Sequence, residues 1–195
     1  MKKAILLLST CLLLTGCDVL NQVSGLFTLS QCDYKYNSIT DIQLSGMNLG
    51  DGSGFSMLDL ANIATVLSGA SKQTIPFNMT LNMDVSNPNK SAAFLNALDY
   101  AVLINEMEFT TGKLDIPIRI EPGSTAKLPI SMAVDLRELM NRYSKDRVAR
   151  EMRSFLGITS EKTDITVKLW PKVMVGNKAV PSPAAIPVVF SFGGK

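Results

Sequence analysis

Apolar and polar residues alternate along much of the chain with a period of two, which is typical of β-strands. The clearest example is residues 75–85, where apolar side chains occupy every second position and Asn, Thr or Asp fills most of the positions between them. Such a strand turns one face toward a core and the other toward water. The pattern therefore predicts a mostly β protein. Further strands are predicted at residues 33–49, 92–104, 107–109, 116–120, 126–134, 163–175 and 188–192.

Two of these regions depart from simple alternation. In residues 33–49 the apolar positions change phase near Asn37, which predicts a long strand with a β-bulge. After residues 92–104, Asn105-Glu106 offers a connection to a short strand that ends at a Thr-Thr-Gly sequence. This second region predicts either two adjacent strands or one bent hairpin.

Residues 116–120 and 126–134 flank the turn sequence Glu-Pro-Gly-Ser at 121–124, and we expect them to pair with each other. Each of the two contains or begins near a proline. Because Pro117 and Pro129 lack an amide hydrogen, we expect them at a strand start or a sheet edge.

Two segments show helical rather than strand periodicity, residues 55–67 and 135–156. In the first, Met57, Leu58 and Leu67 are expected on the apolar stripe. This helix should end near the glycine at position 69 and cover one end or edge of a sheet.

The closest carboxylate pairs have structural interpretations. Asp135 is expected to cap the second helical segment, with Glu138 three positions later as in a capping box. Glu106 and Glu108 are expected to share the solvent face of a strand.

The chain has no histidine, so it lacks the usual neutral-pH base and the commonest zinc ligand. It also lacks a phosphate loop and a nucleophile elbow, so we predict a protein that is not an enzyme and has neither cofactor nor metal.

The second helical segment carries six cations against three acidic residues over about 20 positions. One interpretation is contact with anionic lipid headgroups beside the protein's own anchor. The other, which the interleaved acids favour, is a solvated face with internal ion pairs. The candidate membrane-contacting residues are Arg142, Lys145, Arg147, Arg150 and Arg153.

The N-terminus has the pattern of a bacterial lipoprotein signal. A positive start at residues 1–3 precedes an apolar run at residues 4–14, which is shorter than the ~20 residues that span a bilayer as a helix. The sequence Leu-Thr-Gly-Cys then ends at Cys17, whose thiol is the expected site of lipidation. Two or three acyl chains of the palmitate type give a stable anchor. An ordinary secretory signal with an incidental cysteine is the alternative.

This signal divides the chain into residues 1–16, a cleaved signal peptide; residues 17–32, a lipidated tether; and residues 33–195, a single domain. Residues 18–30 are expected to be either a short tether or a loosely docked N-terminal segment. Cleavage removes Lys2 and Lys3, so the 19 Lys and Arg fall to 17 and equal the 17 Asp and Glu. A balanced charge gives no argument for binding nucleic acid. After cleavage and acylation, Cys32 has no cysteine partner in the chain and is expected to be a buried strand residue.

Several motifs in a fixed order resemble the late embryogenesis abundant type 2 domain, also called the water-stress and hypersensitive-response domain. The resemblance covers residues 76–136, about a third of the chain, and marks Asn87, Pro88 and Asn89 as a family turn. The motifs, in order, are Val85-Ser86-Asn87-Pro88-Asn89, Leu98-Asp99-Tyr100, Ile116-Pro117-Ile118, Glu121-Pro122-Gly123-Ser124 and Leu128-Pro129-Ile130.

The resemblance implies an immunoglobulin-like or fibronectin-III-like β-sandwich of about seven strands. The two helical segments are departures from that pattern and are interpreted as additions to the sandwich. Fold alone does not define function. The resemblance also implies a link to desiccation or other stress tolerance.

The leading hypothesis is a lipid-anchored, non-catalytic binding or protective module of the cell envelope. The alternative is a protein that binds a lipid or other apolar ligand in a groove between the sandwich and the two helical segments. Expected partners are the membrane, through the N-terminal lipid, and an envelope protein or lipid ligand, but no nucleic acid. The sequence leaves both membranes of the envelope open, and our working expectation is an outer-membrane anchor facing the periplasm.

Overall fold

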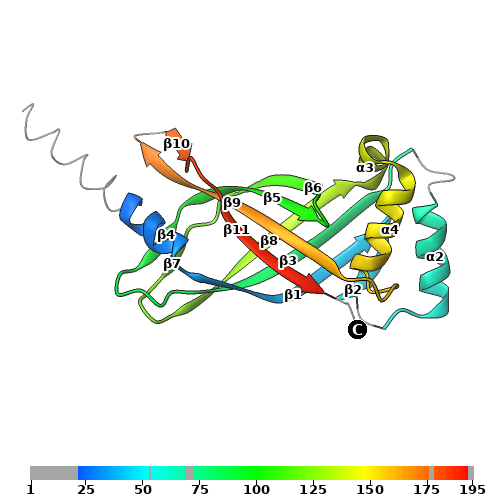
Figure 1. Ribbon diagram of the computed structural model, residues 1–195, viewed down its shortest axis with the longest axis horizontal. Coiled ribbons are helices and arrows are strands. Elements are labelled where there is room, and N and C mark those ends of the chain that lie inside the picture. The colour runs from blue at the N-terminus through cyan, green and yellow to red at the C-terminus, as the bar shows by residue number, and fades with distance from the viewer. Residues whose placement is uncertain (1–21, 53, 69–72, 176–177, 193–195) are drawn as a thin grey trace, which may run out of the picture.

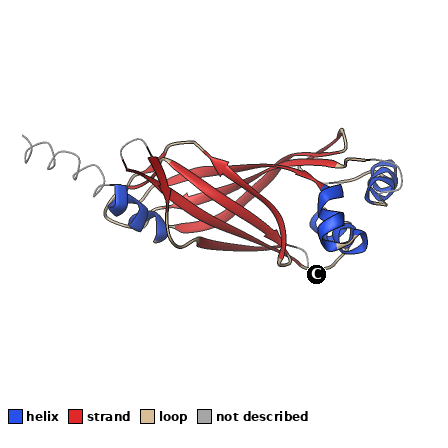
Figure 2. Ribbon diagram, turned by 90° about the horizontal axis from the view of Figure 1, so that it is seen from above, coloured by secondary structure: helices blue, strands red, loops and turns tan. Residues whose placement is uncertain are grey.

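The computed structural model describes residues 22–52, 54–68, 73–175 and 178–192. Two antiparallel sheets enclose a shared apolar core, with helices at both ends of the long axis (Figures 1 and 2). One sheet has the order β2-β1-β3-β8, formed by β1 (Asp33–Leu44), β2 (Met47–Gly50), β3 (Pro76–Ser86) and β8 (Thr125–Asp135). The other has the order β10-β9-β5-β6, with β11 also on β9, formed by β5 (Ala97–Ile104), β6 (Met107–Leu114), β9 (Thr163–Val175), β10 (Lys178–Pro181) and β11 (Ile186–Phe192).

The mostly β prediction is confirmed, although the described strands outnumber the expected seven. Short strands account for the excess, including β4 (Ala93–Leu95) and β7 (Ile118–Ile120), which form a two-stranded sheet of their own. The predicted alternation of β3 is also confirmed. One face of β3 is buried along its whole length, by Phe77, Met79, Leu81, Met83 and Val85.

The predicted bulge in β1 is confirmed, since its register with β3 shifts between Tyr36 and Ser38. The prediction of one strand through residue 49 is wrong, because the chain turns at Ser45-Gly46 and pairs β2 with β1. Both turn residues have positive φ, 52° and 86°, as two-residue hairpin turns require.

The bent-hairpin alternative is correct for the next region. Asn105 and Glu106 form a two-residue turn between β5 and β6, with φ of 46° and 65°. Glu106 therefore lies in the turn, and the prediction that it shares a strand face with Glu108 is wrong. The expected break at the Thr-Thr-Gly sequence is also wrong, because β6 continues through it to Leu114.

The expected pairing of residues 116–120 with residues 126–134 is wrong. β7 pairs with β4, and β8 crosses to pair with β3 from Thr125↔Ser86 to Asp135↔Pro76. Local turn chemistry indicated a hairpin, but each strand finds its partner far away in sequence. The prediction for the prolines is confirmed, since Pro117 immediately precedes β7 and Pro129 lies on the edge strand β8.

The first helical segment is confirmed as α2 (Met57–Leu67), which begins with a capping box between Ser56 and Asp59. Its buried side is narrower than predicted. Ile63 and Leu67 are buried, whereas Met57 and Leu58 are exposed.

The second segment is two helices, α3 (Leu136–Tyr143) and α4 (Lys145–Phe155), and not one. Ser144 separates them with φ 92°, and its hydroxyl accepts from the backbone amide of Arg147. Asp135 caps α3 as predicted, and its carboxylate also accepts from the amide of Ile75, 2.8 Å away. The cap therefore fixes α3 to the start of β3.

Residues 22–30, which lie in the expected tether, form a helix, here called the N-terminal helix. It lies at the end of the molecule that carries β4 and β7, whereas α2, α3 and α4 lie at the opposite end (Figures 1 and 2). Both views agree on this separation. The two ends are therefore built from different parts of the sequence.

The two sheets are joined near the free edge of β6 by Tyr100. Its hydroxyl donates to the backbone carbonyl of Ser131 in β8, 2.8 Å away. Gly112, opposite Tyr100 on β6, makes room for the ring, because a Cβ there would lie 2.3 Å from the hydroxyl oxygen. Gly112 of the Thr-Thr-Gly sequence thus leaves room for the Tyr100 ring, which connects the two sheets.

We predict that Gly112→Ala lowers the free energy of unfolding by about 2 kcal/mol, because the added methyl forces the Tyr100 ring out of place. Urea denaturation measures the effect. The control is Thr111→Ala on the same strand, where the side chain is exposed and a change below about 0.5 kcal/mol is expected. Equal stability of the two variants would contradict the contact.

Candidate apolar pocket beneath the N-terminal helix

The first residue of the N-terminal helix is bound to the sandwich by its side chain. The Gln22 amide oxygen accepts from the backbone amide of Met174 at 2.7 Å and from the Asn96 side chain at 3.2 Å. Its amide nitrogen donates to the Met174 carbonyl at 3.5 Å. Gln22 therefore pairs with β9 much as a neighbouring strand would.

The last turn of the same helix is also bound. The Thr28 carbonyl accepts from the Asn89 side chain, and the Leu29 carbonyl accepts from the Tyr34 hydroxyl at 2.9 Å. Burial raises the pKa of Tyr34 well above its usual range, so this donor stays protonated. Between these ends, Gly25 lies against the Phe94 ring, where a Cβ would come within 2.3 Å of a ring carbon. The helix is held along its length.

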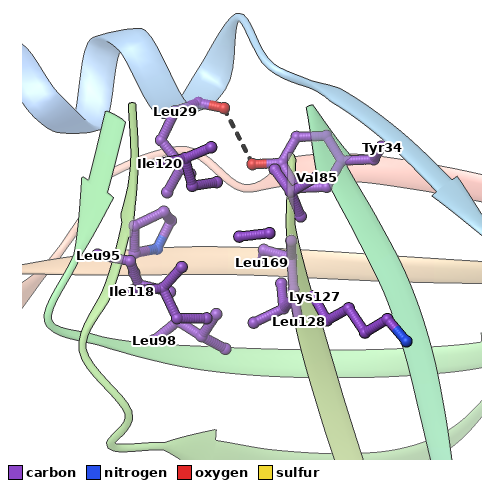
Figure 3. Close-up of a pocket in the computed structure, with 12 residues that line it drawn as sticks. Leu29, Tyr34, Val85, Leu95, Leu98, Ile118, Ile120, Lys127, Leu128 and Leu169 are labelled. Atoms are coloured by element: carbon purple, nitrogen blue, oxygen red, sulfur yellow. Dashed lines mark hydrogen bonds between the residues drawn. The ribbon is translucent and has the colours of Figure 1, made fainter. Parts of the chain in front are cut away.

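Beneath this helix lies a pocket with about 320 Å³ of empty space, little of it wide enough for a water molecule. The side chains around it are apolar except for the ends of two. Tyr34 directs its hydroxyl to Leu29, and Lys127 contributes its carbon chain while its amine points away (Figure 3). The lining residues are Leu29, Tyr34, Val85, Leu95, Leu98, Ile118, Ile120, Ala126, Lys127, Leu128, Leu169 and Pro171.

The predicted family turn is the structural centre of this end. The Asn87 side chain is 1% exposed, and its amide nitrogen donates to the carbonyls of Ser91 and Ile120, each at 2.9 Å. Its amide oxygen accepts from both the backbone and the side chain of Asn89, each at 3.0 Å. The Asn87 backbone bonds to the turn at residues 121–124 through Ser124 and Gly123. Every polar group of Asn87 therefore has a partner.

The predicted cationic contact lies at the other end of the molecule (Figure 1). Arg150 forms an ion pair with Glu151 at 3.3 Å, within the segment as the interpretation with internal ion pairs expects, whereas Arg142 pairs at 3.5 Å with Glu108 of β6, outside the segment. Arg142 and Arg147 also lie over the Tyr143 ring. Among the described residues, the other three cations of the predicted set, Lys145, Arg147 and Arg153, have no ion pair.

The space between the sandwich and α3 is a second pocket of different character. Its polar lining includes Glu108, Asp135, Glu138 and Arg142, and its empty volume is about 510 Å³. A charged lining of this kind does not suit an acyl chain. The groove expected between sandwich and helices is therefore polar where it meets α3.

Of the two cysteines in the expected mature chain, Cys17 lies outside the described residues. Cys32 is buried as predicted, but it lies just before β1 and not in a strand. Burial raises the pKa of its thiol. Its Sγ donates to the Thr28 carbonyl at 3.4 Å, so Cys32 also supports the end of the N-terminal helix.

Among the described residues, no helix is long and apolar enough to cross a bilayer. In the same part of the chain, no group of three or more Cys, Asp or Glu side chains is placed to hold a metal ion.

We predict that Asn87→Asp destabilises the protein by about 3 kcal/mol, because it removes both bonds from the amide nitrogen and brings a buried charge against two carbonyl oxygens. Thermal and urea denaturation measure the loss. The matched control is Asn48→Asp, an exposed position in β2 that should tolerate the same change. A small, equal effect at both sites would show that Asn87 is not a structural centre.

Comparisons with known proteins found similar structures and one matching family. Two solved structures resemble the chain: a protein from Archaeoglobus fulgidus (15% identity, 83% of this chain and 98% of that chain, TM-score 0.35) and one from Arabidopsis thaliana (12%, 83% of each chain, TM-score 0.38). No curated protein sequence matches. The profile of the family described as late embryogenesis abundant protein matches residues 82–183, just over half of the chain, including Asn87, Pro88 and Asn89. The chain therefore belongs to the late embryogenesis abundant protein family.

Proposed function

We propose that this protein is a lipid-anchored, non-catalytic module of the cell envelope that binds or protects other envelope components under desiccation or related stress. Family membership supports a stress-related, non-catalytic role. An immunoglobulin-like or fibronectin-III-like arrangement of the two facing sheets is part of this proposal.

The observation that carries the proposed anchor is the short distance in sequence between Cys17 and the domain. Only residues 18–21 separate Cys17 from Gln22, whose side chain is bound to β9 and Asn96. A lipid on Cys17 would thus hold the folded domain directly at a membrane, and an outer-membrane anchor facing the periplasm is the proposed location.

The cationic side chains of α3 and α4 remain a proposed contact with an anionic membrane surface. They lie at the end opposite the N-terminal helix (Figure 1). Such a contact would therefore involve a surface other than the one beside Cys17, and screening by salt would weaken it.

For the anchor, we expect Cys17→Ser to abolish acylation, because the hydroxyl does not replace the thiol as the acceptor of diacylglycerol. Mass spectrometry of the N-terminal peptide from cells detects the lipid. Cys32→Ser is the matched control and should keep the lipid, since Cys32 is buried in the domain.

In a deletion strain, wild type and Cys32→Ser should restore survival of drying, whereas Cys17→Ser should not. Full survival of the deletion strain would contradict the protective role.

A second function, binding of an apolar ligand, is favoured by the pocket beneath the N-terminal helix. Its walls are apolar and come from both sheets and from Leu29 of the helix. The same side chains also serve as core, so an acyl chain would enter only if the helix and β7 move apart. The proposed ligand site is that apolar pocket and not the polar space beside α3.

We expect native mass spectrometry with lipid extraction, on the mature chain made without its anchor, to detect a stoichiometric apolar ligand. Ala126→Leu, which fills the pocket, should lower occupancy at least fivefold. Ala133→Leu on the exposed face of the same strand should not. A clean apo mass for all three proteins would exclude the ligand and leave the protective module.

A further inference from the structure

The N-terminal helix exposes a pair of large apolar side chains. Val23 is 50% exposed and Phe27 is 66% exposed. Residues four apart lie on the same face of a helix, so the two form one apolar strip. The opposite side of the helix packs on the core through Leu26 and Leu29. The strip thus faces away from the domain.

The surroundings of this strip in the sequence carry no charge. From Val19 to Cys32 there is no Asp, Glu, Lys or Arg, between Asp18 on one side and Asp33 on the other. Charged groups resist transfer out of water, so their absence lowers the cost of placing this helix against an apolar medium. The polar residues of the helix are Gln22, Ser24, Thr28 and Ser30. Three of them satisfy hydrogen bonds inside the protein: Gln22 with β9, and Thr28 and Ser30 with carbonyls of their own helix.

The strip has a fixed place on the molecule. Gln22 binds β9, Asn89 binds the Thr28 carbonyl and Gly25 lies against Phe94. The helix therefore projects from one end of the long axis as part of the folded domain (Figures 1 and 2). Whatever contacts Val23 and Phe27 also sets the orientation of the whole domain.

We propose that Val23 and Phe27 insert into the interface of the lipid bilayer and that the N-terminal helix lies along the membrane surface. This inference rests on the proposed lipid at Cys17 for its choice of partner. Only residues 18–21 lie between Cys17 and Gln22, and the five steps from one Cα to the next limit the separation to about 18 Å even for an extended chain. A lipid surface is thus the first apolar medium within reach of the strip. Apolar helix faces of this kind bind in the plane of the interface.

This proposed membrane contact, through Val23 and Phe27, differs from the contact through the cations of α3 and α4 that the sequence suggested. With the N-terminal helix on the bilayer, α3 and α4 point away from the anchoring membrane (Figure 2). The apolar pocket then lies directly behind the helix that faces the lipid.

The experiment uses the whole protein, expressed from the full-length gene and purified from cells after its processing. It is reconstituted in vesicles of phosphatidylethanolamine and phosphatidylglycerol. A single cysteine is introduced by Val23→Cys or Phe27→Cys and labelled with an environment-sensitive fluorophore, while Cys32 is buried and resists labelling. Leu58→Cys in α2 is the matched control, because Leu58 is 70% exposed and lies at the opposite end. We expect lipid-borne quenchers to reduce emission at positions 23 and 27 at least threefold more than at position 58.

Equal quenching at all three positions, with the lipid found on Cys17, would overturn the inference and leave the anchor intact. Stronger quenching at positions 23 and 27 in a chain without lipid would support the inference and overturn the anchor. Shielding of position 27 by an envelope protein extract but not by vesicles would identify a protein surface and overturn the inference. Thermal melting of each labelled variant confirms that it is folded.

Discussion

The hydrogen bonds of Asn87 hold together the end of the molecule on which the proposed function depends. One side chain of four heavy atoms links the strand β3 to β7 and, through the backbone, to the turn before β8. The Asn89 side chain donates to the Asn87 amide oxygen and also to the Thr28 carbonyl, so it connects Asn87 to the N-terminal helix. Asparagine suits this position because it donates and accepts at once, and each buried partner would otherwise lose a bond. The family turn is therefore a junction between chain segments more than 50 residues apart.

From this junction follows a molecule with two chemically different ends. The N-terminal end combines an uncharged helix, an apolar pocket and an exposed apolar strip. The other end carries the cations of α3 and α4, partly neutralised by Glu108 and Glu151. The Arg142–Glu108 pair is exposed and adds little stability, so it is better understood as shaping the surface charge, whereas Glu151 is buried. In the proposed membrane contact, this separation would orient the protein without any motion of the domain.

The sequence predicted features that local chemistry decides. The alternation of β3, the Asp135 cap and the two-residue turn at Asn105 all depend on neighbours in the chain, and all are present. It did not predict that β7 pairs with β4, because strand partners are chosen by burial across the whole fold and not by the nearest turn. It predicted a short tether or a loosely docked segment after Cys17, but it did not predict that residues 22–30 form a helix bound to the domain. Gln22 and Asn89 gave no local signal, since their partners are 152 and 61 residues away. A long uncharged stretch after Cys17 was the signal that was available.

The family match helps to explain which parts of the site are shared and which are particular to this chain. It begins at residue 82 and includes β4, β5, β7, β8 and β9, which form most of the walls of the apolar pocket. Leu29 and Tyr34, which close the pocket on one side, lie before the matched region. The family fold thus supplies a hydrophobic interior, and the segment after Cys17 supplies the cover that separates it from the surroundings. Because that cover also carries Val23 and Phe27 on its outer face, membrane contact and access to the pocket depend on the same nine-residue helix, residues 22–30. If the N-terminal helix binds the bilayer as proposed, any ligand from the bilayer would have to displace that helix, and the two proposed activities would be physically coupled.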